Sequence, residues 1–588
     1  MRIAAIDHRI CRPTSCHHEC QVFCPVNRAG KPCVTIGSEH AEISENLCTG
    51  CNICVKRCPF DAIRIINLPD SYGRSYIHDY GINQFNLFGF PADLPEGEIC
   101  ALIGANGIGK TTILRILALR CYPNFGDLSK PITRPTEIDL SRFPTKAQQT
   151  IFRRLIAGDL RSVLKIQQID EIRNHLDQDA TVDQFVQTHL ASEEYQSLLL
   201  LIDQLELPLR TKQLRTLSGG EMQLLCILSA CARSKELYLF DEISTYLDLK
   251  ERIRVAQLLL RCFSETRKRV VLIEHDLMIL DLVASYGYIC YGLEAAYGCV
   301  AEKKSIGTAI NEYLSGYLRA ENVRFREDPI VHQRAAPLPR DANTISYQAK
   351  EVSLDQFHLS ILEGKLSEGE ILGIAGPNAI GKTTFLNELE LPANLLPKGM
   401  RIARKPQFLD REHLTVRQML FEGLIDPFTE SFRVDRIHRP LNLEHSYDRS
   451  LDDLSGGELQ RVYIARTLSE NVDLYCFDEP TAFLDLQERL RITKLIKRFI
   501  QDEFRYAILV DHDLFFLSGA ADRILLFEGE PGVRGQTHPI LDVDSGMNQL
   551  LRTQGVTVRR DHQTGRPRVN KPGSTLDIRQ REEGRFWG

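Results

Sequence analysis

The sequence predicts an α/β protein in three folded parts: a small cysteine-rich module followed by two tandem copies of one larger α/β domain. Three observations support this prediction. The chain has 588 residues, too many for a single hydrophobic core. Nine of its 17 cysteines fall within the first 58 residues. Beyond that region the same motifs occur twice, in the same order.

Composition restricts the class of protein. With 43% hydrophobic residues, 26% charged residues and a formal net charge of −6, the chain has an ordinary soluble composition. No apolar run approaches the roughly eighteen residues that a membrane span needs, and "MRIAAIDHRICRP" lacks the apolar core of a signal peptide. We therefore expect a cytoplasmic protein without a membrane partner, whose clustered thiols bind metal rather than form disulfides.

The module contains two cysteine quartets. "LCTGCNICVKRCPF" has the spacing C-x2-C-x2-C-x3-C-P of bacterial ferredoxins, and a stretched version, C-x4-C-x3-C-x3-C-P, precedes it. In two-cluster ferredoxins the fourth cysteine of a run ligates the other cluster. The predicted ligands of two [4Fe–4S] clusters are therefore Cys48, Cys51, Cys54 and Cys24 for one, and Cys11, Cys16, Cys20 and Cys58 for the other. Zinc is the alternative, because C-x2-C pairs also bind it. Cys33 has no assigned role beyond that of a buried thiol.

The repeated domains differ in length. "INQFNLFGFPADLPEGEICALIGANGIGKTT" matches "LDQFHLSILEGKLSEGEILGIAGPNAIGKTT" at an offset of 272, whereas "LSGGEMQ" matches "LSGGELQ" at an offset of 237, so the first copy is 35 residues longer between these motifs. Most of the extra length lies within about residues 122–160. Apolar residues at helical spacing in "TKAQQTIFRRLIAGDL" predict a helical insertion there; a surface loop is the alternative.

Each copy contains a G-x4-G-K-T phosphate loop between a strand-like apolar run and a helical one. The glycines let backbone N–H groups approach phosphates, the lysine reaches the terminal phosphates, and the threonine can ligate Mg²⁺. The predicted nucleotide-binding residues are Gly104, Asn106, Gly107, Gly109, Lys110, Thr111 and Thr112 in the first copy and Gly376, Asn378, Gly381, Lys382, Thr383 and Thr384 in the second.

In each copy an apolar run also ends in Asp-Glu, with a glutamine before it and a histidine after it. The aspartate would hold Mg²⁺ with the threonine, and the glutamate would polarise the attacking water. The glutamine would contact metal or water, and the histidine would reach the γ-phosphate. These candidates are Gln167, Asp241, Glu242 and His275 in the first copy and Gln407, Asp478, Glu479 and His512 in the second. The sequence therefore predicts two sites of Mg²⁺-dependent ATP hydrolysis.

This ordered set, with LSGGE before the acidic strand, resembles the ATP-binding cassette superfamily. The resemblance implies that the two copies face each other head to tail and sandwich two ATP molecules, so that each LSGG loop completes the other copy's site. The loop residues implied in this role are Ser218 and Gly220 for the ATP held by Lys382, and Ser455 and Gly457 for the ATP held by Lys110.

The resemblance extends to coupling loops and aromatic residues. "YLD" at 246–248 and "FLD" at 483–485 are similar to the loops that couple the two sites in this superfamily. Tyr80 and Phe85 are expected to stack on adenine. For Phe357, stacking and an ordinary place in a strand or core are equal alternatives.

Two cassettes behind a two-cluster module resemble the class E cassette ATPases, the RNase L inhibitor family. This resemblance implies a ribosome-recycling ATPase. Two ATP molecules would close the cassettes, and closure would swing the iron–sulfur domain and split the ribosome after termination or rescue, together with a release factor or its rescue homologue. It further implies a monomer that binds mainly the small subunit, through rRNA and protein, with initiation factors as further partners.

The expected boundaries follow from the motifs and this resemblance. They are 1–74 for the ferredoxin-like iron–sulfur domain, 75–312 for the first nucleotide-binding domain, 313–340 for a hinge, 341–552 for the second nucleotide-binding domain, and 553–588 for a second hinge with a basic C-terminal segment. From Arg559 to Arg585 that segment has eight Lys or Arg against four acidic residues. It would either lie on RNA phosphates or pack along the hinge.

The first copy departs more than the second from the family pattern, so we expect unequal turnover at the two sites. Leucine replaces an arginine, isoleucine replaces a proline, and two residues beside Gln167 differ; the positions are Leu224 (Arg461 in the second copy), Ile243 (Pro480), Ile166 and Gln168. The insertion also differs from the family's helix–loop–helix that contacts the small subunit. Other functions considered are a cassette ATPase at another ribosomal step, an ATP-coupled electron-transfer protein and a transporter subunit.

Overall fold

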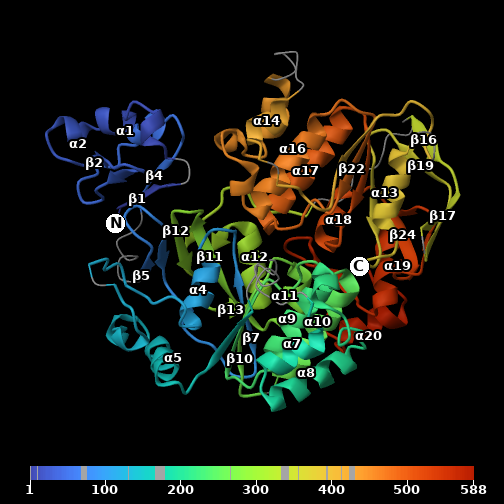
Figure 1. Cartoon of the computed structure of the whole chain (residues 1–588), viewed down its shortest axis with the longest axis horizontal. Coiled ribbons are helices and arrows are strands. Elements are labelled where there is room, and N and C mark those ends of the chain that lie inside the picture. Colours follow the sequence, from blue (N-terminus) through green and yellow to red (C-terminus); the bar gives the residue numbers. More distant parts are fainter. Residues whose placement is uncertain are drawn as a thin grey trace. The chain divides into compact units, whose positions relative to one another are not determined.

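The computed structural model describes residues 2–8, 11–67, 76–129, 131–165, 179–264, 266–332, 343–354, 356–391, 395–411, 413–422 and 431–588 (Figure 1). Ile166, Gln167 and Gln168 lie outside these residues, as does part of the expected first hinge. Contacts divide the chain into two compact units. The first unit comprises Met1–Ile243, Gln257–His275 and Val283–Pro329, and the second comprises Ser244–Ala256, Asp276–Leu282 and Ile330–Gly588.

The cysteine-rich module, dark blue in Figure 1, consists of short elements around its thiols. Strand β1 pairs with β4 and β2 pairs with β3, both antiparallel. The elements are β1 (Arg2–Ile6), α1 (Glu19–Val22), α2 (Pro25–Arg28), β2 (Val34–Ile36), β3 (Ala41–Ile43), α3 (Ile53–Arg57) and β4 (Ile63–Asn67). The cysteines make up much of the small core, together with Ala4, Ile6, Val34, Ile43 and Ile63. Such a core is weak alone and requires support from metal or from docking.

Asn83 docks the module onto the first nucleotide-binding domain within the first unit. Its Nδ2 donates to the carbonyls of Ala4 (2.7 Å) and Ile43 (2.9 Å), and its Oδ1 accepts from the Ile43 amide (2.6 Å). The Asn83 carbonyl accepts from the Ile6 amide (2.9 Å). Asn83 is buried and has a φ of 55°, a left-handed conformation that asparagine tolerates better than most residues. One residue thus bonds both small sheets of the module.

The first nucleotide-binding domain is built on a mixed sheet that, within the described residues, has nine strands in the order β5-β6-β12-β11-β7-β10-β9-β8, with β13 beside β11. Strands β11, β7, β10, β9 and β8 run parallel. The strands are β5 (Tyr76–Asp79), β6 (Asn86–Phe88), β7 (Ile99–Ile103), β8 (Ser162–Lys165), β9 (Leu237–Asp241), β10 (Arg269–Ile273), β11 (Tyr286–Leu293), β12 (Tyr297–Val300) and β13 (Lys304–Ser305). Residues of β7 and β9 are buried on both faces, as expected for central parallel strands between helices.

Helices alternate with the strands. They are α4 (Lys110–Leu117), α5 (Lys146–Ala157), α7 (Val182–His189), α8 (Ser192–Gln204), α9 (Gly219–Ala232), α10 (Leu249–Phe263), α11 (Leu277–Val283) and α12 (Ile306–Ser315). Helix α4 packs on β8, β9 and β10, α9 packs on β8 and β9, and α8 packs on α9. The hairpin β14 (Tyr317–Leu318) and β15 (Val323–Arg324) comes next in the chain.

Helix α5 lies in the insertion of the first copy. Thr145 caps its first turn by accepting from the Gln148 amide at 3.2 Å, and Gly158 ends it with a φ of 80°. On its inner face Phe152 stacks on Phe143 with a ring separation of 4.1 Å and approaches Phe90 at 5.4 Å. The insertion is therefore packed into the hydrophobic core of the first nucleotide-binding domain.

The second nucleotide-binding domain repeats this topology. Its sheet has the order β17-β18-β25-β24-β20-β23-β22-β21, with β26 beside β24, and β24, β20, β23, β22 and β21 are parallel. The strands are β16 (Thr344–Tyr347), β17 (Lys350–Leu354), β18 (Phe357–Ile361), β19 (Gly364–Ser367), β20 (Ile371–Ala375), β21 (Ile402–Lys405), β22 (Leu474–Asp478), β23 (Tyr506–Val510), β24 (Arg523–Glu530), β25 (Arg534–Thr537) and β26 (Leu541–Asp542). The helices are α13 (Lys382–Glu390), α14 (Val416–Phe421), α16 (Gly456–Ser469), α17 (Leu486–Asp502), α18 (Leu514–Ala520) and α19 (Val543–Gln554).

The basic C-terminal segment is folded, and arginines in it pair with an acidic residue of α11. It forms β27 (Val558–Arg560), β28 (Pro567–Val569) and α20 (Thr575–Glu582). Arg566 is fully buried and forms a bidentate ion pair with the buried Asp281 of α11, which Arg568 also approaches at 3.3 Å. Arg560 approaches His332 at 3.5 Å. Of the two expectations for this segment, packing along the hinge fits these contacts.

Candidate functional site

The two phosphate loops leave β7 and β20 and enter α4 and α13. Gly109 and Gly381 precede the helices with φ of 90° and 99°, which glycine adopts without strain. Lys110 Nζ donates to the carbonyls of Gly104 (2.8 Å) and Ala105 (2.6 Å), and Lys382 makes the same pair of bonds in its own loop. Burial lowers the pKa of Lys382 to about 8. The other predicted loop residues lie in these loops or in the first turns of the helices.

A threonine and an aspartate meet beside each loop. Thr111 Oγ1 donates to Asp241 Oδ2 at 2.9 Å, and Thr383 Oγ1 donates to Asp478 Oδ2 at 3.2 Å. Burial raises the pKa of Asp241, while the Thr111 hydrogen bond and the Lys110 charge act against this rise. A hydroxyl beside a carboxylate is the hard oxygen donor set that suits Mg²⁺, so these residues fit the ion predicted for them.

An arginine acts on this aspartate in both copies, but from different elements. In the second copy Arg404 of β21 donates to Asp478 Oδ2 at 3.0 Å. The matching position of the first copy is Leu164, which packs against the core. There burial raises the pKa of Asp241, and the charge of Arg115 of α4 is the weakest of several effects that oppose this rise, after those of Thr111, Lys110 and Lys165. The position matching Arg115 in the second copy is Asn387.

The glutamate after each aspartate lies next to the predicted histidine. Glu479 Oε1 accepts from Gln407 Nε2 at 2.8 Å and lies 3.5 Å from His512 Nε2. Glu242 Oε1 lies 3.8 Å from His275 Nε2. Burial opposes ionisation of Glu479, but the neighbouring His512 outweighs it, with help from the charges of Lys382 and Lys405, and lowers the pKa of Glu479 to about 2. The structure thus brings glutamate and histidine together in both copies, and glutamine with them in the second.

The backbone of each glutamate is left-handed and fully hydrogen-bonded. Glu242 has a φ of 49° and Glu479 a φ of 48°, a conformation that costs a non-glycine residue about 1–2 kcal/mol. Their amides donate to the carbonyls of Ile273 (3.0 Å) and Val510 (2.9 Å). Their carbonyls accept from a buried lysine and a buried glutamine. The donors are Lys165 (2.6 Å) and Gln223 (2.8 Å) in the first copy and Lys405 (3.1 Å) and Gln460 (3.2 Å) in the second.

Sequence reasoning missed these four donors. The signal for them is nonetheless present, because "LKIQQID" and "RKPQFLD" share the lysine, and "LSGGEMQ" and "LSGGELQ" share the glutamine. Sequence motifs point to residues that reach the substrate, whereas these four side chains donate to the main-chain carbonyls of Glu242 and Glu479.

Each LSGG loop begins a helix with a capping box. Ser218 Oγ accepts from the Glu221 amide (3.2 Å), and Glu221 accepts in return from the Ser218 amide (2.9 Å). Ser455 and Glu458 form the same pair at 3.3 and 2.8 Å. The free amides and positive dipole end of such a helix suit an anion. Gly220 lies in the first turn of α9, and Gly457 in the first turn of α16.

The aromatic candidates pack against the phosphate loops. A Cβ added to Gly109 would lie 2.8 Å from the Phe85 ring, and one added to Gly381 would lie 3.0 Å from the Phe357 ring. The two phenylalanines therefore occupy equivalent places. Tyr80 is 42% exposed, and its hydroxyl lies 2.9 Å from Thr112 Oγ1.

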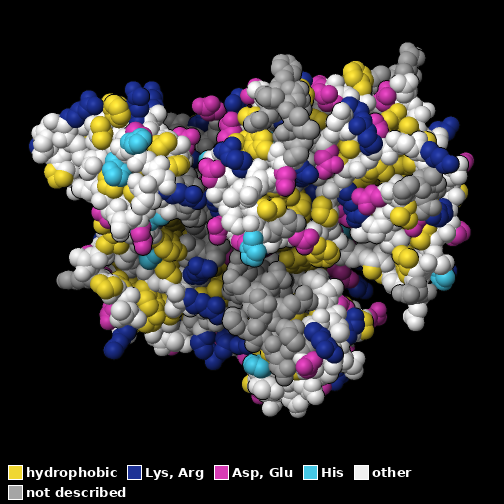
Figure 2. All heavy atoms as spheres, turned by 45° about the horizontal axis from the view of Figure 1, so that its top comes forward, with side chains coloured by type: hydrophobic (Ala, Val, Ile, Leu, Met, Phe, Trp, Pro, Cys, Tyr) yellow, Lys and Arg dark blue, Asp and Glu magenta, His cyan; other side chains and the backbone are white. Residues whose placement is uncertain are grey.

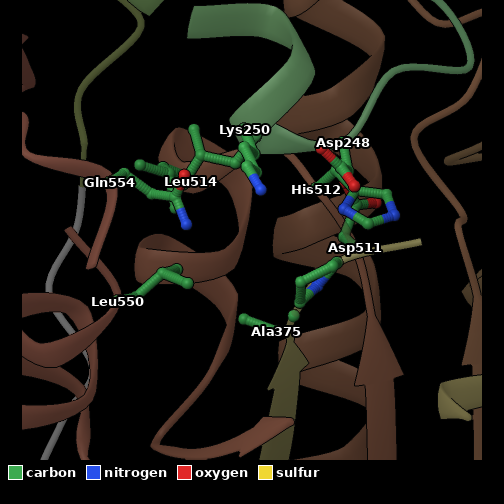
Figure 3. Close-up of a pocket in the computed structure, with 11 residues that line it drawn as sticks. Asp248, Lys250, Ala375, Asp511, His512, Leu514, Leu550 and Gln554 are labelled. Carbon is green, nitrogen blue, oxygen red and sulfur yellow. The ribbon is translucent and has the colours of Figure 1, made fainter. Parts of the chain in front are cut away.

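A pocket of about 340 Å³ in the second unit adjoins the second phosphate loop (Figure 3). Asp248, from the "YLD" segment, accepts from the Asn378 amide at 2.8 Å. In Figure 3 the side chains of Asp248 and His512 lie next to each other, and Lys250 extends into the same space. The segment after the first acidic strand thus contacts the second phosphate loop.

The cysteines form two groups. Cys24, Cys33, Cys48, Cys51 and Cys54 line a cavity of about 310 Å³. Cys24 comes from the earlier quartet, so the grouping matches the crossed ligand set predicted for one cluster. Within the described residues no three ligating side chains are close enough to share one ion; a cubane instead offers each thiolate its own iron.

The second group is seen in the surroundings of Cys20. Burial raises the pKa of the Cys20 thiol to about 12, and the neighbouring thiols of Cys58, Cys11 and Cys16 contribute to the rise. These four are the crossed set predicted for the other cluster. Cys33 is 2% exposed and lies at the first cavity.

This fold and these sites define an ATP-binding cassette ATPase that binds an iron–sulfur cluster. The ABC transporter family model matches residues 87–245 and 359–482, and the 4Fe-4S binding domain model matches residues 41–64. None of the helices in the described ranges is both long and apolar enough to span a bilayer.

Full-length relatives specify the family. An uncharacterised ABC transporter ATP-binding protein of Methanocaldococcus jannaschii is 37% identical, over 100% of this chain and 97% of that protein. Translation initiation factor RLI1 of Chaetomium thermophilum is 36% identical, with coverages of 100% and 97%. A solved structure described as a model of ribosome-bound archaeal Pelota and ABCE1 matches with a TM-score of 0.91 and 35% identity, covering 100% of this chain and 99% of the other. The chain belongs to the E family of ABC proteins, the RNase L inhibitor family.

Proposed function

We propose that this protein is an ATP-driven ribosome recycling factor. One observation carries the proposal: two phosphate loops, each beside its acidic strand, and a docked cysteine-rich module occur in one chain, which aligns along its whole length with a solved structure described as ribosome-bound archaeal Pelota and ABCE1. Its partners are the ribosome, mainly the small subunit, and a release factor or its rescue homologue. It works in the cytoplasm, and the initiation-factor relative supports a further role on the small subunit.

Each site hydrolyses ATP with the same set of groups. The phosphate loop and Lys110 or Lys382 hold the phosphates, and Thr111 with Asp241, or Thr383 with Asp478, holds Mg²⁺, which offsets phosphate charge when bound. Glu242 and Glu479 orient and polarise the attacking water, His275 and His512 contact the γ-phosphate, and Gln167 and Gln407 contact metal or water. Ser218, Gly220, Ser455 and Gly457 complete the sites when the cassettes close.

The eight cysteines hold two [4Fe–4S] clusters, in the crossed sets described above. The clusters serve as the structural core of a module too small to be rigid without metal. Docking through Asn83 connects this module to the first cassette, so a movement of that cassette on ATP binding is transmitted to the module.

Basic and aromatic side chains on the module suit a ribosomal contact. The guanidinium groups of Arg28 and Arg57 lie 5.3 and 4.8 Å from the centre of the Phe23 ring. In Figure 2 basic and hydrophobic side chains lie together on the module, at the upper left. Such groups bind RNA phosphates and unstacked bases.

Ribosome splitting tests the proposal directly. Ribosomes from a matched source are incubated with the protein, a termination or rescue factor and ATP, then separated by sedimentation. We expect free subunits only when ATP and intact clusters are both present. Intact ribosomes despite ATP consumption would overturn the ribosomal role and leave the ATPase in place.

Metal analysis tests the cluster count separately. Anaerobically purified protein should contain about eight irons and eight sulfides, as two cubanes require. About four irons, or zinc instead, would contradict the two-cluster assignment. A cluster reduction potential that changes when ATP binds would instead favour the function of an ATP-coupled electron-transfer protein.

A further inference from the structure

We propose that Lys165 and Lys405 are positioning residues for ATP hydrolysis, each holding the main chain of the catalytic glutamate so that its carboxylate faces the reacting groups. The inference rests on the catalytic role proposed above for Glu242 and Glu479. Neither lysine belongs to the phosphate loop or to any other motif assigned above.

The geometry is the same in both copies. Lys165 Nζ donates to the carbonyls of Asp241 (2.8 Å) and Glu242 (2.6 Å). Lys405 Nζ donates to the carbonyls of Asp478 (2.8 Å) and Glu479 (3.1 Å). Each lysine ends the strand next to the acidic one, in register with the phenylalanine before the aspartate. The ammonium group therefore lies across the carboxyl end of the acidic strand.

Burial shows that these lysines are not surface charges. Lys165 is 4% exposed and Lys405 is 0% exposed. A buried ammonium group is unfavourable unless it is hydrogen-bonded, so a position that needed only core packing would favour an apolar residue. The neighbours differ between the copies: leucine and isoleucine flank Lys165, whereas arginine and proline flank Lys405. The common feature is the pair of carbonyls that each ammonium group bonds.

The strained glutamate explains what the bonds achieve. Glu242 and Glu479 hold a left-handed backbone, which a non-glycine residue leaves readily unless neighbours fix it. Their amides are fixed by the adjacent strand, and their carbonyls by the lysine with a glutamine. If the lysine bond is lost, only the glutamine still bonds that carbonyl, and the peptide after the glutamate is held less firmly. The carboxylate would then leave its place beside the histidine.

Each lysine is tested in a chain whose other site is inactive. Lys405→Met is placed in Glu242→Gln protein and Lys165→Met in Glu479→Gln protein, so that steady-state turnover belongs to one site. We expect kcat to fall roughly 10- to 100-fold with the KM for ATP nearly unchanged, because misplacement of a catalytic group affects the chemical step more than binding. Lys350→Met, which removes an ion pair between the edge strand β17 and Glu388 of α13, is the control for loss of a lysine contact away from the glutamate and should keep its kcat.

A second combination separates positioning from a general defect. Lys405→Met added to Glu479→Gln should cause no further loss, because the lysine acts through a glutamate that is already disabled and the first site remains intact. A further loss, or a KM that rises in parallel with the fall in kcat, would overturn the inference. So would an unchanged kcat in the first experiment.

The design also separates this inference from the proposed function. If Glu479→Gln and Glu242→Gln each leave turnover intact, the catalytic assignment itself fails. If the glutamate variants are inactive while the lysine variants are not, only the positioning role fails. Should Lys405→Met fail to fold, Lys405→Gln keeps an N–H donor group and should lose only part of the kcat, and Lys165→Met makes the same test in the other copy.

Discussion

Arg404 is the residue at which the two Mg²⁺ sites differ most clearly. Its guanidinium bonds the same oxygen of Asp478 that Thr383 bonds. A cation that binds Asp478 must therefore replace or share this ion pair. The first copy has a leucine there, and its own arginine acts from α4.

We predict that Arg404→Leu strengthens Mg²⁺ binding at the second site. A partly buried ion pair contributes about 1 kcal/mol, so the Mg²⁺ concentration for half-maximal turnover should fall by roughly fivefold. The measurement is turnover against Mg²⁺ in Glu242→Gln protein. Arg401→Leu, which removes an exposed pair with Asp473, is the control. An unchanged or higher midpoint would show that Arg404 does not compete with the metal.

The pair Arg566–Asp281 connects residues 285 positions apart in the chain. Both side chains are 1% exposed. Removing one partner of a buried pair leaves an uncompensated charge, although Arg568 remains near Asp281.

Arg566→Met should therefore lower the free energy of unfolding of this segment by about 3 kcal/mol. The single tryptophan of the chain, Trp587, is buried beside Arg560 and reports the unfolding by fluorescence in urea. Arg579→Met, at an exposed pair with Glu583, should cost less than about 0.5 kcal/mol. Adding Asp281→Leu to Arg566→Met should restore much of the loss; a double variant no more stable than Arg566→Met would contradict the account.

For single residues, the sequence predicts side chains that face the substrate far better than buried side chains that hold those residues in place. The phosphate loops and acidic strands have fixed spacings because the bound phosphate dictates them. Lys405 and Arg566 are buried charges whose partners come from distant segments, and no local pattern specifies such a partner.

Among the elements, the loop carrying Asn83 decides how the cluster module is attached. The residue follows β5 and bonds strands β1 and β3. Spacing of cysteines predicts which thiols group together, and the cavity at Cys24 agrees with it. Nothing in the cysteine pattern predicts the docking contact, because an asparagine between two elements is usually a turn residue.

Asn83→Ala should loosen the module without unfolding the cassette. It leaves two carbonyls and one amide without their partner, at about 1–3 kcal/mol for each group that water does not reach. Hydrogen exchange at β1 and β3 should accelerate by tenfold or more, about 1.4 kcal/mol of local stability, while β7 and β9 keep their protection. Gln84→Ala, which removes one 3.5 Å contact with His8, is the control. Equal acceleration of hydrogen exchange in Asn83→Ala and Gln84→Ala would show that Asn83 does not dock the module.

The inserted helix shows how much of an element is readable from sequence. Apolar spacing predicts a helix within 145–160, and Thr145 and Gly158 carry ordinary cap chemistry. The stacking of Phe152 on Phe143 and Phe90 is not predictable, because Phe90 belongs to the segment before β7.

On the scale of the whole molecule, the two copies share a topology but not a complete set of contacts. Arg461 forms an ion pair with Glu488 at 3.3 Å, whereas the matching Leu224 is a buried apolar side chain. Pro480 follows the second glutamate, and Ile243 follows the first. The sequence repeat predicts that the two domains share a fold. Equal rates of ATP hydrolysis would also require equivalent residues around the two sites.

We therefore expect Glu242→Gln and Glu479→Gln to remove different fractions of steady-state ATP turnover, by more than roughly a factor of two. Rates are measured with and without ribosomes, at saturating ATP. Cluster content is checked in each variant, so that a loss of iron is not mistaken for a loss of chemistry. Identical losses would mean that the sites are equivalent despite Leu224 and Ile243.

The different origin of the arginine beside the metal-binding aspartate also has a historical consequence. After the duplication, an ancestor carried either both arginines or neither before the present pattern arose, with Arg115 in one copy and Arg404 in the other. When the two copies are aligned position by position, they differ at both places, because Arg115 matches Asn387 and Leu164 matches Arg404. Each copy thus places one arginine charge near the aspartate, from α4 in the first copy and from β21 in the second.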